Sequence, residues 1–270
     1  MGPPGGWPRS VVFAGALVAV AAAVRADVGW LSGAACAVAV AGCWQRHAPV
    51  RDGQSAVVAT LVGLWTAFGL IPHAAFCAVA ALGATLAPWH LLALDAAVGV
   101  AAAARLWRAL PAGQRLATLR DDWAVPDLAA VAAVALAVGA GYALRHGGAL
   151  SPFACVQAAA GAALGNGQPA DLLRGNIGDA QLGNASLIAG AWLRNLELAH
   201  LHALCGLTLA LAGWALARQA GRSARAGWAG LAVLALNPLV LTAPLTDENA
   251  FAAALFACVL AVAYQARSAR

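Results

Sequence analysis

Apolar residues fill the chain in long stretches, which are separated by short polar links. The stretches are continuously rich in Ala, Leu and Val and do not alternate with polar residues, so the pattern favours membrane helices over the strands of a membrane barrel. One helix needs about 20 apolar residues to cross the hydrocarbon core. We therefore predict an all-α, polytopic transmembrane helical bundle with about eight membrane helices, within a range of about eight to ten. The predicted crossings lie in residues 10–24, 28–44, 56–107, 123–144, 196–218, 228–240 and 249–264.

Arginine-rich links set the predicted orientation of these helices. The links at 45–52, 105–122 and 218–225 carry arginines, and arginines gather on the cytoplasmic side of membrane proteins. The acidic link at 246–248 is expected to face the opposite compartment. Because two cytoplasmic links enclose residues 56–107, an even number of crossings must lie between them. We expect two crossings in this block, one of them broken near a proline.

The polar stretch between residues 145 and 195 is predicted to form one long extracytoplasmic loop. Its apolar segment 152–164 has 13 residues, fewer than a crossing requires, and we interpret it as an amphipathic or re-entrant element. Three Gly-Asn pairs, at 165–166, 175–176 and 183–184, predict tight turns with left-handed residues. Long loops in compact chains are commonly functional, so this loop is the first place to look for chemistry.

Composition places the chain in the membrane class. Hydrophobic residues make up 62% of the sequence and charged residues 10%, with a mean hydropathy of +0.76. Soluble domains have about 45–50% apolar and about 25% charged residues. The chain has no lysine and is rich in Ala and Gly, which indicates a GC-rich bacterial genome. The predicted location is therefore the bacterial cytoplasmic (inner) membrane.

The positive charge indicates membrane lipid as a partner and argues against nucleic acid. The net charge is +5, but the arginines sit singly at segment ends, whereas a nucleic-acid-binding protein would cluster them in a stripe. We interpret them as topology and lipid-headgroup anchors. The cysteines are scattered without Cys-x-x-Cys spacing, so no metal knuckle is predicted.

The last third of the chain carries a family resemblance. Residues 203–218 form an Ala/Leu-rich stretch that ends in Ala-Arg, an Asn-Pro pair follows at 237–238, and an acidic turn at 246–248 precedes another apolar helix. This order resembles the GT-C superfamily of membrane glycosyltransferases, above all the mannosyltransferases that depend on polyprenyl-phosphate mannose. The resemblance implies a module of one helix, a long outer loop with short helices and a catalytic carboxylate, and three terminal helices. It divides the chain into N-terminal transmembrane helices at 1–122 and a GT-C-like module at 123–270.

The same resemblance implies transfer of a sugar from a lipid-linked donor, a polyprenyl-phosphate sugar. One carboxylate at the membrane surface would act as general base toward the acceptor hydroxyl, and an arginine would hold the phosphate through paired hydrogen bonds. Asp179 is the first candidate for the base, because it lies in the middle of the loop, and Asp171 is the second. Arg174 or Arg194 would hold the phosphate.

Two acidic residues ahead of the last apolar stretch line the same predicted outer face. Carboxylates in the first turn of a helix are favoured by its dipole, here with Thr246 as the cap. Asp247 and Glu248 are therefore either helix-start residues or contacts to the substrate or to a divalent metal.

The alternative is a non-catalytic integral membrane subunit of a larger complex, because abundant Ala and Gly let helices of partner membrane proteins approach closely. Such a subunit would bind pigment or haem through intramembrane histidines. The candidate histidines are His73, His90, His200 and His202. Glu197 and His200 also have the Glu-x-x-His spacing of di-iron bundles, but those sites need two copies of the motif and the sequence has one.

Overall fold

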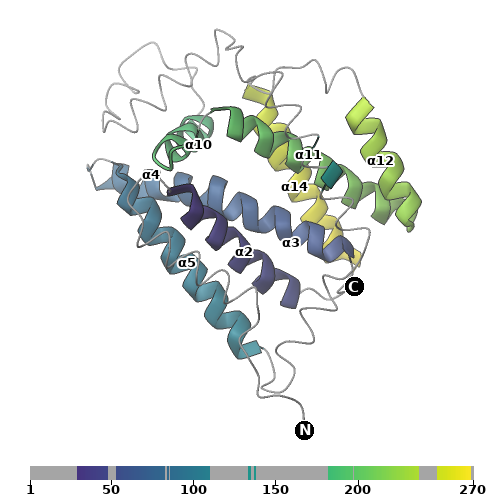
Figure 1. Cartoon of the computed structure of the whole chain (residues 1–270), viewed down its shortest axis with the longest axis horizontal. Helices are drawn as coiled ribbons and strands as arrows, with labels where there is room; N and C mark the ends of the chain where they lie inside the picture. Colours follow the sequence, from purple (N-terminus) through teal and green to yellow (C-terminus); the bar gives the residue numbers. More distant parts are fainter. Residues whose placement is uncertain are drawn as a thin grey trace.

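Figure 1 shows the computed structural model of the chain as a bundle of α-helices. The structure describes residues 29–47, 53–82, 84, 86–109, 133–134, 137, 182–196, 198–236 and 248–268. These ranges contain helices and no strand, which confirms the all-α prediction for the described part. Three described helical segments are long and apolar enough to cross a membrane, namely Ala56–Val79, Pro88–Ala109 and His200–Gly221. They indicate a membrane protein, whereas the total of eight crossings and the long outer loop stay predictions.

The described helices follow the apolar stretches of the sequence closely. In chain order they are α2 (Gly29–His47), α3 (Gly53–Trp65), the π-helical turn η2 (Thr66–Leu70), α4 (Ile71–Ala81), α5 (Pro88–Ala109), α10 (Leu182–Trp192), α11 (Leu198–Gly221), α12 (Ala224–Leu236) and α14 (Glu248–Ser268). Because α3, η2 and α4 join without a break, residues 56–107 form two helical runs, the number that the charge of the flanking links predicts.

The first of these runs passes through Pro72 because the π-turn precedes it. A proline in a regular α-helix removes one hydrogen bond and its ring collides with the carbonyl four residues back. Here the N–H of Ile71 donates to the carbonyl of Thr66, five residues back, so the ladder is already widened ahead of the proline. A π-turn of this kind is a known way to absorb such a helix irregularity.

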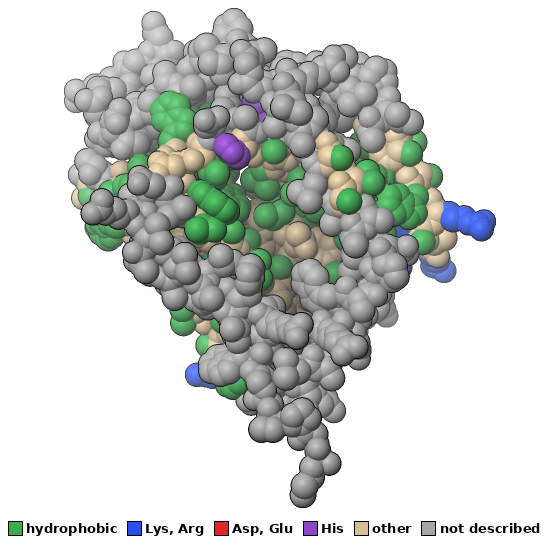
Figure 2. Space-filling model, viewed as in Figure 1, with side chains coloured by type: hydrophobic (Ala, Val, Ile, Leu, Met, Phe, Trp, Pro, Cys, Tyr) green, Lys and Arg blue, Asp and Glu red, His purple; other side chains and the backbone are tan. Residues whose placement is uncertain are grey.

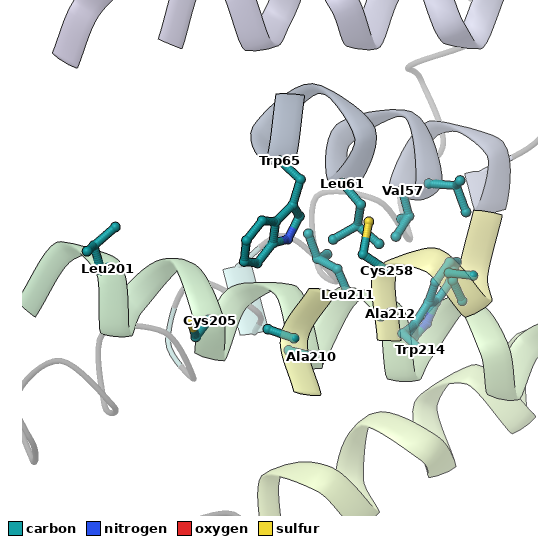
Figure 3. Close-up of a cluster of buried hydrophobic side chains, with 14 of the residues drawn as sticks. Val57, Leu61, Trp65, Leu201, Cys205, Ala210, Leu211, Ala212, Trp214 and Cys258 are labelled. Carbon is teal, nitrogen blue, oxygen red and sulfur yellow. The ribbon is translucent and has the colours of Figure 1, made fainter. Parts of the chain in front are cut away.

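Helix α3 lies at the centre of the described bundle (Figure 1). On one side it packs against α2, which in turn packs against α5, and on the other side it packs against α11 and α14. Helix α12 packs antiparallel along α11, and α10 packs against α4. One apolar cluster joins α3, α11 and α14 around Leu61, Leu211 and Cys258 (Figure 3). A second apolar cluster joins α2, α4 and α5 around Cys36, Ile71 and Leu91.

A buried polar contact fixes α3 against α11 inside the first cluster. The Trp65 indole N–H donates to the Thr208 hydroxyl oxygen over 3.0 Å, and the Thr208 hydroxyl donates to the Leu204 carbonyl over 2.7 Å. Each polar group thus has a partner where water is absent, as burial in apolar surroundings requires.

The ends of the bundle differ in charge. Arg46 Nη2 donates to the Ala109 carbonyl at the C-terminal ends of α2 and α5, and Gln219 Nε2 donates to the Tyr264 carbonyl at the C-terminal ends of α11 and α14. Figure 3 shows α3 and α11 running antiparallel, which brings both sets of C-terminal ends to one end of the bundle, here called the arginine end. Every described arginine except Arg194 lies there, and Figure 2 shows such side chains at the margin of an apolar surface.

Exposed aromatic side chains mark both ends. Trp30, Trp89 and Trp192 are exposed at the end opposite the arginines, where α2 and α5 begin and α10 stops. Trp44 and Tyr264 are exposed at the arginine end. Trp and Tyr gather at the two membrane–water interfaces of membrane proteins, so this distribution fits a bundle that spans a bilayer.

One local prediction is wrong. The Gly-Asn pair at 183–184 was expected to form a tight turn, but it lies inside α10. Packing overrides the turn preference, because Leu187, Ile188 and Ala191 of the same helix are buried against the bundle and burial outweighs a weak local propensity. The pairs at 165–166 and 175–176, and the segment 152–164, lie outside the described residues.

Close packing of α2 on α3 depends on Gly63. A Cβ at this position would overlap the carbonyl oxygen of Ala37, a backbone atom that has no freedom to move aside. We predict that Gly63→Ala destabilises the protein by about 1–3 kcal/mol, as overpacking generally does. The loss should appear as a lower Tm in detergent.

Gly99→Ala is the matched control for this substitution. Its Cβ would stand 3.5 Å from the Cα of Cys36, an ordinary van der Waals distance at the interface of α2 with α5. A Tm that falls equally in both variants, or in neither, would contradict the packing assigned to Gly63.

Candidate functional site

The sequence-predicted site residues fall mostly outside the described part of the chain. Asp171, Arg174, Asp179 and Asp247 lie in undescribed ranges, and Glu248 begins α14 with only its backbone described. Their predicted roles therefore stay predictions. Arg194 is the one member of this set with a described side chain, and its surroundings define the candidate site.

A helix-ending turn places Arg194. The N–H of Leu196 donates to the Ala191 carbonyl over 2.8 Å, and the N–H of Asn195 donates to the Trp192 carbonyl over 3.0 Å. Asn195 has φ 56°. These features form a Schellman motif, in which a left-handed residue follows the last helical residue and asparagine tolerates that conformation. The turn directs the Arg194 side chain into the bundle, where it is 2% exposed.

Arg194 is bound on three sides by groups from two elements, α5 and η2. Its Nη2 lies 2.6 Å from Asp95 Oδ1 of α5, and its Nη1 donates to the Ala67 carbonyl of η2 over 2.8 Å. The guanidinium lies 5.3 Å from the centre of the Phe68 ring, which is a cation–π distance. Gly33 of α2 leaves the room for this group, since a Cβ there would lie 3.4 Å from Arg194 Cζ and closer still to Phe68.

The π-turn supplies the acceptor for Arg194. In a π-turn the Ala67 carbonyl would accept from the residue five positions on, but that residue is Pro72, which has no N–H. The N–H of Ile71, four positions on, is already bonded to Thr66. The Ala67 carbonyl is therefore free to accept from the arginine, and a buried carbonyl needs such a partner.

Asp95 is held on its other side by α2. The Ser32 hydroxyl lies 2.7 Å from Asp95 Oδ2 and 2.8 Å from the Gly29 carbonyl. Because an ionised carboxylate only accepts, the hydroxyl donates its single proton to Asp95 when the pair is charged. The Asp95 side chain is fully buried and lies six residues after Trp89, a rise of about 9 Å along α5 from the interface.

Burial and the neighbouring carboxylate act on the charge of Arg194 in opposite directions. Burial lowers the pKa of the Arg194 guanidinium, and the Asp95 carboxylate beside it opposes that change. The ordinary pKa of arginine is so high that the group stays protonated near neutral pH. The Nε of Arg194 is buried without a hydrogen-bond partner. The cost of burying the guanidinium is therefore offset by its contacts with Asp95 and with the Ala67 carbonyl.

A second contact fixes α10 beside this pair. His73 Nδ1 of α4 lies 3.0 Å from the Ser186 hydroxyl of α10. Gly190 sits against the Pro72 ring so closely that a Cβ would overlap it. Together with the ion pair, these contacts fasten residues 182–195 to α2, η2, α4 and α5. Arg194 is engaged with Asp95, so it would have to leave that carboxylate in order to hold a phosphate.

Asp95 was not singled out from the sequence, although a signal was present. It is the only acidic residue between positions 56 and 107, in a block that is otherwise apolar. An ionisable residue within a membrane helix is by default a candidate functional residue with a partner to be found. The partner itself is 99 positions away along the chain, and no local pattern indicates it.

The histidines that were predicted as ligand candidates lie on three described helices: His73 on α4, His90 on α5, and both His200 and His202 on α11. His90 Nδ1 accepts from the N–H of Ala87 over 2.9 Å at the start of α5 and stacks on Trp89, whereas His73 contacts Ser186 of α10. Glu197 lies outside the described residues. Within the described ranges no group of three or more His, Cys, Asp or Glu side chains is arranged to hold a metal ion.

The stability of the protein should depend on the presence of both Asp95 and Arg194. We predict that Asp95→Asn or Arg194→Gln alone destabilises the protein by about 3–5 kcal/mol, because each leaves an uncompensated buried charge. The double variant Asp95→Leu with Arg194→Met should recover most of that loss. A double-mutant cycle on Tm in detergent measures the coupling.

Arg105→Gln serves as the control for charge removal, because this arginine is exposed at the other end of α5 and exposed substitutions usually change stability by less than about 0.5 kcal/mol. Single variants as stable as this control would show that the buried pair contributes nothing.

Searches against known protein families, curated proteins and solved structures found no match to this chain.

Proposed function

We propose that the chain is a membrane glycosyltransferase of the GT-C type, which moves a sugar from a polyprenyl-phosphate carrier to an acceptor at the outer face of the bacterial cytoplasmic membrane. The observation that carries the proposal is the anchoring of residues 182–195. The Asp95–Arg194 pair and the His73–Ser186 contact hold the end of the polar segment 145–195 on the bundle. The described helices that follow are α11, α12 and α14, and both α12 and α14 pack on α11.

The distribution of charge supports an outer position for this segment. The arginine end is the cytoplasmic end by the positive-inside rule. Helices α2, α5, α11 and α14 all begin at the opposite end, where α10 also lies. The described end of this segment, residues 182–195, therefore lies at the proposed extracytoplasmic end of the bundle, and Glu248 at the start of α14 belongs to the same end.

The proposed chemistry needs few protein groups. The acceptor oxygen attacks the anomeric carbon, the bond from that carbon to the phosphate oxygen breaks, and the polyprenyl phosphate leaves with the electron pair. Asp179 takes the acceptor proton as general base, with Asp171 as the second candidate. Arg174 holds the phosphate, whereas Arg194 positions the loop through Asp95. Asp247 and Glu248 contact the substrate or a divalent metal.

One observation favours the second candidate function, a non-catalytic subunit of a larger membrane complex. Helix α5 packs mainly on α2 and to a smaller extent on α4, and it exposes large apolar side chains such as Trp89 and Val100. A partner membrane protein would bury this face. Visible absorption of the purified protein checks whether such a subunit carries haem or pigment.

Catalysis is tested by Asp179→Asn. We predict that this variant, in purified and reconstituted form, loses sugar transfer from polyprenyl-phosphate mannose or a related hexose by about 100-fold or more, because loss of a positioned general base typically costs 10²–10⁴-fold. Radiolabelled sugar transferred to an acceptor is the measurement. Asp52→Asn is the matched control, since this residue lies on the predicted cytoplasmic link. Full activity of Asp179→Asn would refute the assignment.

Sidedness is tested by labelling single cysteines. With the native cysteines replaced, a cysteine at position 179 should react with a membrane-impermeant maleimide in intact cells. A cysteine at Ser223, which is exposed at the arginine end, should react only after the membrane is opened. The reverse pattern would place the loop in the cytoplasm and remove the basis of the proposal.

A further inference from the structure

The turn between α11 and α12 carries a basic cluster, defined here as Arg218, Arg222 and Arg225. Arg222 and Arg225 are exposed and Arg218 is half-buried. We propose that this cluster binds the phosphate of an anionic phospholipid headgroup at the arginine end of the bundle. The proposal does not depend on the glycosyltransferase activity.

Arg218 is held in place but left with an unsatisfied donor. Its guanidinium lies 5.0 Å from the centre of the Trp214 ring, a cation–π contact that fixes the side chain against α11. Its Nη1 is nevertheless buried without a hydrogen-bond partner, and so is Nε1 of the fully buried Trp214 one helical turn away. An unpaired buried donor is costly, and a cationic one is best satisfied by an anionic acceptor.

The other two arginines lie on the same turn, between the end of α11 and the first turn of α12. Arg222 has φ 49°, a left-handed conformation that ends α11. Ser223 then caps α12, because its Oγ accepts from the N–H of Ala226 over 3.2 Å. The first turn of α12 presents the positive end of its dipole beside the arginines, which adds to the attraction for an anion without requiring another side chain.

The surroundings favour a phospholipid over a soluble anion or an acidic protein segment. Among side chains that the structure describes, the only acidic one is Asp95, which lies toward the other end, so no described carboxylate neutralises the cluster. Apolar helix surface flanks the cluster, with Val233 exposed on α12 and Tyr264 exposed at the nearby end of α14. A ligand with an anionic head and apolar chains matches both features.

The test uses the full chain, purified and stripped of lipid in a neutral detergent. Thermal unfolding is measured with phosphatidylglycerol, with phosphatidylcholine and with inorganic phosphate, and native mass spectrometry counts the retained lipids. Phosphatidylglycerol should raise Tm and remain bound, whereas phosphatidylcholine should do neither. Arg218→Gln, Arg222→Asn and Arg225→Gln should each weaken phosphatidylglycerol binding about fivefold. Asparagine is chosen at 222 because it tolerates the left-handed backbone.

Arg108→Gln is the matched control, since this arginine is exposed at the same end of the bundle but on α5. It should leave phosphatidylglycerol binding unchanged. Equal loss in Arg108→Gln and in Arg222→Asn would show a general surface charge effect and overturn the site. Stabilisation by inorganic phosphate equal to that by phosphatidylglycerol would overturn the assignment to a lipid. Should Arg218→Gln fail to fold, the exposed residues Arg222 and Arg225 still decide the outcome.

Discussion

The described bundle depends on one buried ion pair, Asp95 with Arg194, which joins residues 99 positions apart. In a low-dielectric interior, a lone carboxylate or guanidinium would be strongly disfavoured, and the two together are tolerated because each also has neutral hydrogen-bond partners. Ser32 supplies the partner for Asp95 and the Ala67 carbonyl supplies one for Arg194. Four separate elements of the chain therefore meet at a single point.

The Ala67 carbonyl can accept from Arg194 because residue 72 is a proline. Pro72 lacks the N–H that would have closed the helix ladder, and the π-turn ahead of it directs the neighbouring N–H to Thr66 instead. The π-turn and the ion pair are thus parts of one arrangement. The helix irregularity next to Pro72 leaves the Ala67 carbonyl as an acceptor for Arg194. The π-turn lies where a segment from the other half of the chain docks, in keeping with the tendency of such turns to occur at functional places.

Much of the helical layout could be predicted from apolar length, because the cost of an unpaired backbone group in a membrane leaves few alternatives to helices. The stretches 28–44, 228–240 and 249–264 correspond to α2, α12 and α14 with shifted boundaries. The candidate site could be predicted from the sequence only in part. The sequence analysis named Arg194, but as a phosphate-binding residue. Its contact with Asp95 was not predicted, because that contact arises from packing between helices far apart in the sequence. The turn predicted at 183–184 was wrong for the same reason, because tertiary burial makes these residues part of helix α10.

The distance between Asp95 and Arg194 along the chain has a consequence for biogenesis. Synthesis proceeds at about 5–20 residues per second, so the arginine emerges about 5–20 s after the aspartate. During that interval the Asp95 carboxyl group has no arginine partner, and the only one of its observed polar neighbours already made is the Ser32 hydroxyl of α2. Packing of α2 on α5 would therefore give Asp95 its first hydrogen-bond partner before the second half of the polypeptide is made.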